Sequence, residues 1–198
     1  MGALVPPGHR SATALGVAGP DDATLDDLAR AATDGDPAAV ERVCDALLTP
    51  VSRYVSMRVR SREDAEDLTQ LVFERIVSGL PRYRHNGRPF AAWAFRIARN
   101  AVIDHQRRVR RTEPLATARD HYELPPDALA LRGEEIRELA RAIRQLTSDQ
   151  QEALALRYAA GLSAEEAAQV MGRRAGTVRG LTFRAVESLR RRLTAPAD

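Results

Sequence analysis

The sequence predicts an all-α fold made of two small helical domains, and three observations support this prediction. Apolar residues recur three or four positions apart along most of the chain, which places them on one face of a helix. Residues that favour helix starts precede these stretches, and no stretch of useful length alternates between apolar and polar residues as a strand does. With 44% hydrophobic but only 5% aromatic residues, the 198-residue chain suits modest helix-packed cores.

The first domain is expected to contain five helices, each begun by a capping residue or a proline. These starts lie at Thr24, Asp36, Pro50, Ser61 and Pro89. Pro50 is expected to separate the second helix from the third, and the fourth helix is expected to end near Gly79. The fifth, after Pro89, is the clearest, and its apolar stripe includes Trp93, which we therefore expect in the core rather than stacked on a ligand. Its opposite face is basic.

The second domain is expected to end in a helix-turn-helix at about residues 163–184. Ser163 to Glu166 is a capping box ahead of a short helix, and Gly172 supplies the turn before the next helix. Five residues of that second helix suit contacts with DNA bases and phosphates: Arg173, Arg174, Thr177, Arg179 and Arg184. Any two short helices joined at a glycine look similar, so the pattern alone leaves a purely structural interpretation open.

Composition narrows the classes of function. All 30 basic residues are arginines, which suit phosphate and base contacts, although a GC-rich genome explains this usage equally well. The net charge is only +3, because acidic residues gather early in the chain and basic ones gather on two later helices. The lone Cys44 fits a reducing compartment, and prolines and glycines near the N-terminus argue against a signal peptide or membrane span. The four histidines lack metal-ligand spacing, and the adjacent Asp104 and His105 point about 100° apart on a helix, so we expect neither a catalytic nor a metal site.

The expected organisation has five segments. A tail at 1–22 precedes the first domain at 23–111, a linker at 112–127, the second domain at 128–194 and a short tail at 195–198. Because the linker is rich in proline and lacks helical periodicity, we expect it to be a slack tether between two separate bodies.

At this point the sequence resembles a known family, the bacterial RNA polymerase sigma factors of the extracytoplasmic-function group within the sigma-70 family. The resemblance covers about Leu25 to Leu193. The motifs that carry it are Asp64–Phe73, Arg88–Trp93, Ile97–Asn100, Gly161–Ser163 and Gly176–Arg179.

The resemblance implies a role for three groups of residues. The core-polymerase contact would be made by Asp64, Asp67, Leu68, Gln70, Phe73 and Glu74. The promoter's minus-ten element would be bound, and one base captured, by Tyr83, His85, Asn86, Arg88, Arg96, Arg99, Asn100, Arg107 and Arg108. The minus-thirty-five element would be bound by the five helix-turn-helix residues named above. Without the family, the acidic side chains would be interpreted as ordinary helix solubilisers.

Four positions depart from the family pattern. Arg174 stands where a Ser-type cap is common, and Gly180–Leu181 replaces a more usual Ser–Arg pair, which leaves the minus-thirty-five preference open. Leu71 stands where an acidic residue is frequent, which leaves the polymerase contact less well defined.

The resemblance implies a cytoplasmic bacterial sigma factor that binds core RNA polymerase and promoter DNA and assists promoter melting. It implies an anti-sigma partner as well, and no cofactor, small-molecule substrate or membrane insertion. The competing hypothesis is an ordinary two-domain regulator that binds an operator without polymerase. Such a regulator would bind duplex DNA by itself, whereas a sigma factor of this group is expected to bind promoter DNA weakly until polymerase joins it.

Overall fold

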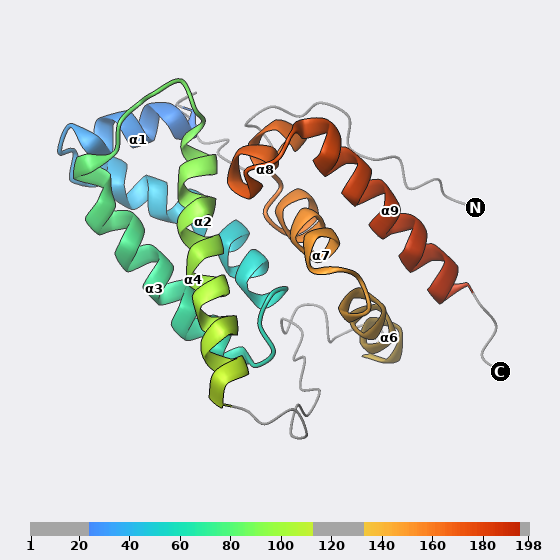
Figure 1. The fold of residues 1–198 in the computed structure, drawn as a ribbon. Helices are drawn as coiled ribbons and strands as arrows, with labels where there is room; N and C mark the ends of the chain where they lie inside the picture. Colours follow the sequence, from blue (N-terminus) through green and yellow to red (C-terminus); the bar gives the residue numbers. More distant parts are fainter. Residues whose placement is uncertain (1–23, 113–132, 195–198) are drawn as a thin grey trace.

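The computed structural model describes residues 24–112 and 133–194, and within them it is helical with no strand, as predicted. The first group of helices comprises α1 (Leu25–Thr33), α2 (Pro37–Ser56), α3 (Arg62–Gly79), the short 3-10 helix η2 (Leu80–Arg82) and α4 (Phe90–Thr112). The second group comprises α6 (Gly133–Arg144), α7 (Ser148–Leu154), the π-helical turn η3 (Ala155–Ala159), α8 (Ala164–Met171) and α9 (Ala175–Leu193) (Figure 1). In these two ranges, no helix is both long enough and apolar enough to cross a membrane.

Four of the predicted helix starts, at Thr24, Asp36, Ser61 and Ser163, are confirmed by their capping hydrogen bonds. Complete capping boxes are present at Thr24, Thr147 and Ser163, where a side chain three residues on accepts a hydrogen bond from the backbone N–H of the capping residue. Asp36 and Ser61 also cap their helices, each accepting a hydrogen bond from a first-turn backbone N–H. The cap residues in the sequence therefore fix where these helices begin.

The predicted break at Pro50 is wrong, because α2 runs through this residue without interruption. Proline in a helix interior costs about 3 kcal/mol through its lost hydrogen bond and its clash with the preceding turn. The side chains of Val43, Leu47, Val51 and Tyr54 are fully buried and form one stripe on both sides of Pro50. Since each buried side chain of this size contributes about 1.5–3 kcal/mol, packing of the stripe offsets the cost of the proline.

The first group packs α2, α3 and α4 against one another, while α1 contacts α2, η2 and α4. Tyr54 on α2 and Phe95 on α4 are fully buried and meet edge to face, with ring centroids 5.7 Å apart. The carboxylate of Asp26 on α1 accepts a hydrogen bond of 2.5 Å from the backbone N–H of Phe90. This contact satisfies one free donor at the start of α4 and fixes that helix relative to α1.

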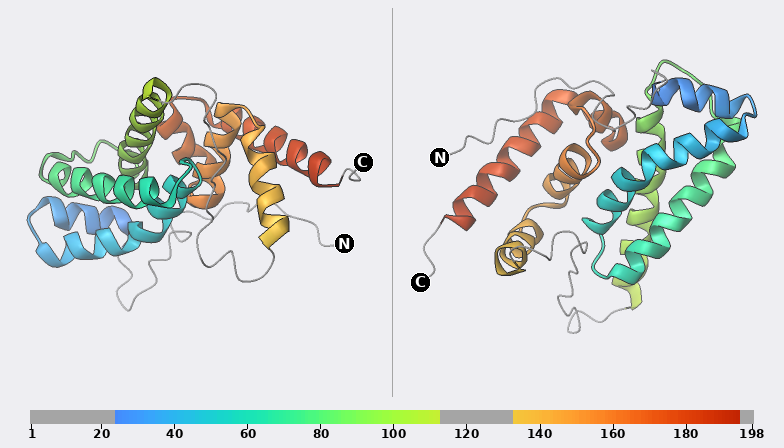
Figure 2. Two further views of the ribbon diagram at one scale, coloured as in Figure 1. Left: turned by 90° about the horizontal axis from the view of Figure 1, so that it is seen from below. Right: turned by 180° about the vertical axis from the view of Figure 1, so that it is seen from behind.

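The two groups of helices lie against each other rather than apart. α8 packs on α4 and η3 packs on α2, and buried residues of both groups contribute to one apolar cluster, so the two predicted helical domains are present and contact each other. Both views in Figure 2 place α7 and α8 between α9 and the first group. The predicted linker after Thr112 and the predicted tails at 1–22 and 195–198 lie outside the described residues.

We expect Gly79→Ala to lower the free energy of unfolding by about 1 kcal/mol or more through overpacking. A Cβ atom at Gly79 would lie 3.0 Å from one ring carbon of Trp93 and 3.2 Å from another, and that ring is held against Tyr83 and Phe90. Urea unfolding measures the loss, and the fluorescence of Trp93, the only tryptophan, reports the displaced ring.

The matched control is Gly176→Ala in α9, where an added Cβ meets nothing within 4 Å. This change should raise stability slightly, because alanine is favoured over glycine in helices by about 1 kcal/mol. Equal stabilities for the two variants would contradict the close packing of Trp93 on α3.

Candidate nucleic-acid interface

A cavity of about 200 Å³ lies between the loop before α4 and the first turns of α4. Its lining residues are Arg82, Tyr83, Arg84, Asn86, Arg88, Ala92, Trp93, Arg96 and Gln169. The structure thus brings together four of the residues predicted for the minus-ten element. Arginines at the rim and aromatic rings below are the combination that binds single-stranded nucleic acid through phosphate contacts and stacking.

Tyr83 forms the floor of this cavity rather than an exposed wall. Its side chain is buried, and its ring lies 5.1 Å from that of Phe90, 5.0 Å from that of Trp93 and 4.8 Å from that of His85, between centroids. The Tyr83 hydroxyl donates a hydrogen bond of 3.3 Å to the backbone carbonyl of Arg88, and burial raises its pKa above the ordinary value. Tyr83 is therefore a neutral group that shapes the loop, and Trp93 packs partly buried against the core, as predicted.

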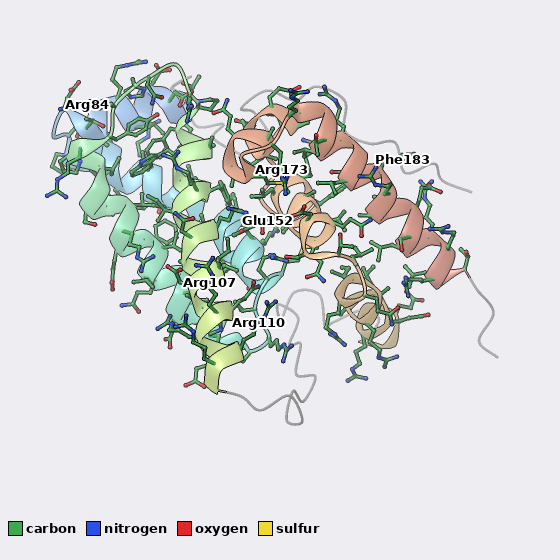
Figure 3. The ribbon with its side chains drawn as sticks, in the orientation of Figure 1. Arg84, Arg107, Arg110, Glu152, Arg173 and Phe183 are labelled. Atoms are coloured by element: carbon green, nitrogen blue, oxygen red, sulfur yellow. The ribbon has the colours of Figure 1, made fainter. Side chains whose placement is uncertain are left out.

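Outside the cavity, α4 carries the predicted basic face. Arg96, Asn100, Arg107 and Arg108 are exposed, and Arg107 lies on the lower half of α4 in Figure 3. Arg99 is the exception, because its side chain is only 28% exposed and its Nε lies 3.6 Å from a carboxylate oxygen of Glu152 on α7. Arg99 thus faces the second group of helices rather than solvent.

The helix-turn-helix forms as predicted from α8, the turn at Gly172 and α9. Gly172 has φ +64°, a left-handed conformation that favours glycine, which explains why the turn falls there. Arg174 is the N-cap of α9 but makes no capping hydrogen bond with its side chain, which leaves backbone N–H groups at this helix start open to an anion. Arg174, Thr177 and Arg184 are exposed.

Two other arginines of this segment are exposed but paired. Arg173 lies 3.2 Å from the carboxylate of Asp149, and Arg179 lies 2.7 Å from that of Glu165. Because these side chains are between 52% and 61% exposed, such pairs are weak and a phosphate can replace the carboxylate.

Phe183 is a surface residue of α9 that the sequence analysis missed. Its side chain is 68% exposed, the most exposed of the large hydrophobic side chains in the described part of the chain, and it lies between Arg179 and Arg184 in the sequence (Figure 3). The helical spacing of the sequence could have predicted this exposure, because Phe183 falls outside the buried stripe that includes Val178 and Ala185. Gln169 of α8 was missed as well, since only the folded chain brings it to the cavity on α4.

The acidic face of α3 is largely as predicted. Asp67, Gln70 and Glu74 are exposed, and the Gln70 side-chain amide donates a hydrogen bond of 3.1 Å to Glu74. Asp64 is partly covered, since its carboxylate accepts a hydrogen bond of 2.6 Å from the Ser61 hydroxyl.

Two apolar residues of the set predicted for polymerase behave differently. Leu68 is only 3% exposed, so its side chain belongs to the core and its predicted contact with polymerase is corrected to a packing role. Phe73 is partly buried against the core and keeps some exposed surface.

Comparison with known proteins gives two matches to family models. The model described as Sigma-70 region 2 matches residues 44–112, and the model described as Sigma-70, region 4 matches residues 136–189. A curated relative, the ECF RNA polymerase sigma factor BldN of Streptomyces coelicolor, is 35% identical over 177 residues, which cover 87% of this chain and 67% of BldN.

Two solved structures share the fold. CnrH, in complex with the cytosolic domain of CnrY, is 24% identical with a TM-score of 0.67, covering 87% of this chain and 99% of CnrH. The sigma factor RpoE of Bartonella quintana, in complex with the anti-sigma factor NepR, is 23% identical with a TM-score of 0.60, covering 79% of this chain and 98% of RpoE.

Proposed function

This chain belongs to the sigma-70 family, within its extracytoplasmic-function group of transcription initiation factors, and from that premise we propose how its surfaces act at a promoter. Its region 2, proposed to span residues 23–111, contacts core RNA polymerase and the minus-ten element. Its region 4, proposed to span residues 128–194, binds the minus-thirty-five element. One observation carries the proposal: a single chain holds both an arginine-rimmed aromatic cavity and an exposed helix-turn-helix.

At the minus-ten element, the cavity captures one base of the non-template strand and so assists melting. Unstacking a base costs a few kcal/mol, which contacts in the pocket and to the backbone must offset. Asn86 offers an amide that can both donate to and accept from a base edge, while Arg88 and Arg96 offer charge for the neighbouring phosphates. Arg107 and Arg108, exposed farther along α4, extend this basic surface along the strand.

At the minus-thirty-five element, α9 lies in the major groove. Arg174, Arg179 and Arg184 supply contacts to phosphates and guanine edges. Phe183 supplies an apolar surface of the kind that contacts a thymine methyl group. This contact fills part of the gap left by Gly180, which carries no side chain for the DNA.

Two protein partners complete the proposal. Asp67, Gln70 and Glu74 on α3 form the contact with core polymerase, with Asp64 and Phe73 at its margin. An anti-sigma factor is the second partner, since the related fold of RpoE is found bound to NepR.

We predict that this protein, added to purified core polymerase, starts transcripts at specific promoters in run-off assays on a genomic library. The physical reason is that the two promoter-binding surfaces proposed above belong to this chain, whereas RNA synthesis belongs to the polymerase. Transcript start sites are mapped with and without the protein. In a separate measurement, the affinity of the free protein for duplex promoter DNA is determined. Strong operator-like binding without polymerase, together with no promoter-dependent transcript, would instead favour the ordinary regulator.

The double substitution Asp67→Arg and Gln70→Arg is expected to abolish binding to core polymerase and to leave the circular dichroism spectrum unchanged. Both side chains are exposed, so the core is untouched, while the local charge is reversed. Surface plasmon resonance against immobilised core polymerase measures the affinity. Glu41→Arg on α2, another charge reversal in the first group, is the control, and polymerase affinity equal to wild type in the double variant would remove the assignment to α3.

Phe183→Ala is expected to reduce transcription from a promoter that depends on its minus-thirty-five element by about tenfold, because the apolar contact with a thymine methyl group is lost. Stability should not change, because this side chain is 68% exposed. Leu48→Ala removes a comparable apolar side chain, 53% exposed on α2, and should have no effect. Equal transcript yields for the two variants would exclude Phe183 from the DNA contact.

A further inference from the structure

A buried cluster of charged residues joins the two groups of helices. Glu152 on α7 is 4% exposed, and one of its carboxylate oxygens accepts a hydrogen bond of 2.8 Å from the Tyr54 hydroxyl on α2. Its other oxygen lies 3.2 Å from the guanidinium of Arg58, which is 8% exposed. Arg99 on α4 approaches the same carboxylate at 3.6 Å, so side chains from α2, α4 and α7 meet at Glu152.

Further hydrogen bonds hold the cluster in place. Arg58 donates to the side-chain oxygen of Gln151 at 3.1 Å, and the side chain of Gln106 on α4 donates to the backbone carbonyl of Arg58 at 2.8 Å. Burial raises the pKa of Tyr54 well above its ordinary value, so this hydroxyl remains a neutral donor toward Glu152. Each residue of the second group in this cluster therefore contacts a residue of the first.

The cluster is nevertheless incompletely satisfied. The buried Nε atoms of Arg58 and Arg99 have no hydrogen-bond partner among the described residues. A distance of 3.6 Å from Arg99 to Glu152 is too long for a hydrogen bond, although it is close enough for electrostatic attraction. Charged groups buried in this way add specificity more than net stability, because opening the interface returns all of them to water.

The closed arrangement occupies part of the surface proposed for the minus-ten strand. Arg99 lies between the exposed Arg96 and Asn100 along the sequence of α4, yet its charge is directed to Glu152. The side chain of Gln169 on α8 lines the same cavity as Asn86 and Arg88. The side of α9 that carries Phe183 is not covered by the first group of helices, since this side chain is 68% exposed.

We propose that the Glu152 cluster is an autoinhibitory latch, which holds region 4 over the minus-ten surface of region 2 until the two domains are separated. The proposal rests on the function proposed above, because it gives the covered surface its role. A nucleic-acid phosphate carries the same charge as the Glu152 carboxylate and competes with it for Arg99. Strand binding and latch closure therefore exclude each other, and the free protein binds the strand weakly.

Glu152→Gln is the direct test, because it keeps the size of the side chain and removes its charge. In the closed form, the buried Arg58 and the partly buried Arg99 then both lose their negatively charged partner, a cost that is absent from the open form. In small-angle scattering, the full-length variant is expected to have a larger radius of gyration than wild type. The free variant should also bind a fluorescent single-stranded oligonucleotide of the minus-ten sequence about tenfold more tightly, reflecting a shift toward the open population.

Glu187→Gln is the matched control, because it makes the same chemical change at an exposed pair with Arg190, 3.1 Å away within α9. It should behave as wild type in both assays. Tyr54→Phe is the second variant, since it removes one hydrogen bond to Glu152 without leaving an unpaired charge. It should shift both readouts in the same direction by a smaller amount, which keeps the test valid if Glu152→Gln destabilises α7.

Scattering profiles of Glu152→Gln and Tyr54→Phe identical to wild type would overturn the latch. An opened chain with unchanged oligonucleotide affinity would overturn the autoinhibition as well, because the minus-ten surface would then not have been covered. The scattering result does not depend on polymerase, whereas failure of the wild-type protein in run-off transcription would overturn the proposed function. The two failures are thus distinguishable.

Discussion

The packing of the two groups of helices depends on which side chains pair with one buried carboxylate, that of Glu152. An ionised carboxylate away from water is stable only when opposite charges and hydrogen-bond donors surround it. Here the donor Tyr54 comes from α2, Arg58 comes from the turn that follows α2, and Arg99 comes from α4, so the carboxylate of region 4 is satisfied by region 2. The apolar cluster that continues across the same boundary supplies attraction, while the charges determine which surfaces meet. The position of region 4 over α4 follows from this constraint.

The same packing explains why the two surfaces proposed to bind the promoter differ in availability. The floor of the cavity on region 2 is built rigidly, because Tyr83, Phe90 and Trp93 pack ring against ring and Asp26 fixes the start of α4. Its edge, however, is shared with α8. The helix-turn-helix has its capping box and its left-handed glycine within region 4, and the exposed side of α9 that carries Phe183 lies outside the contact with region 2. One surface is therefore controlled by the domain contact and the other is not.

Local signals explain what could be predicted from the sequence. Caps such as Thr24 and Ser163, the left-handed Gly172 and the apolar stripe of α4 each act within a few residues, so their outcome could be predicted without the fold. The continuous helix through Pro50 could not, since it depends on burial of Val51 and Tyr54 against other helices. The core position of Leu68 also depended on which face of α3 is covered, and a motif match does not reveal that face. Glu152 was hidden for the same reason, because Tyr54 and Arg58 precede it by more than ninety positions and Arg99 precedes it by about fifty.

The central claim is that one surface of region 2 is used alternately, by region 4 in the free protein and by the promoter strand in the polymerase complex. The most direct measurement is the distance distribution between spin labels at the exposed positions Leu48 and Leu193, in a Cys44→Ala background. The account predicts a narrow distribution for the free protein and a longer distance once core polymerase and promoter DNA are added. The same distribution in both states would contradict it.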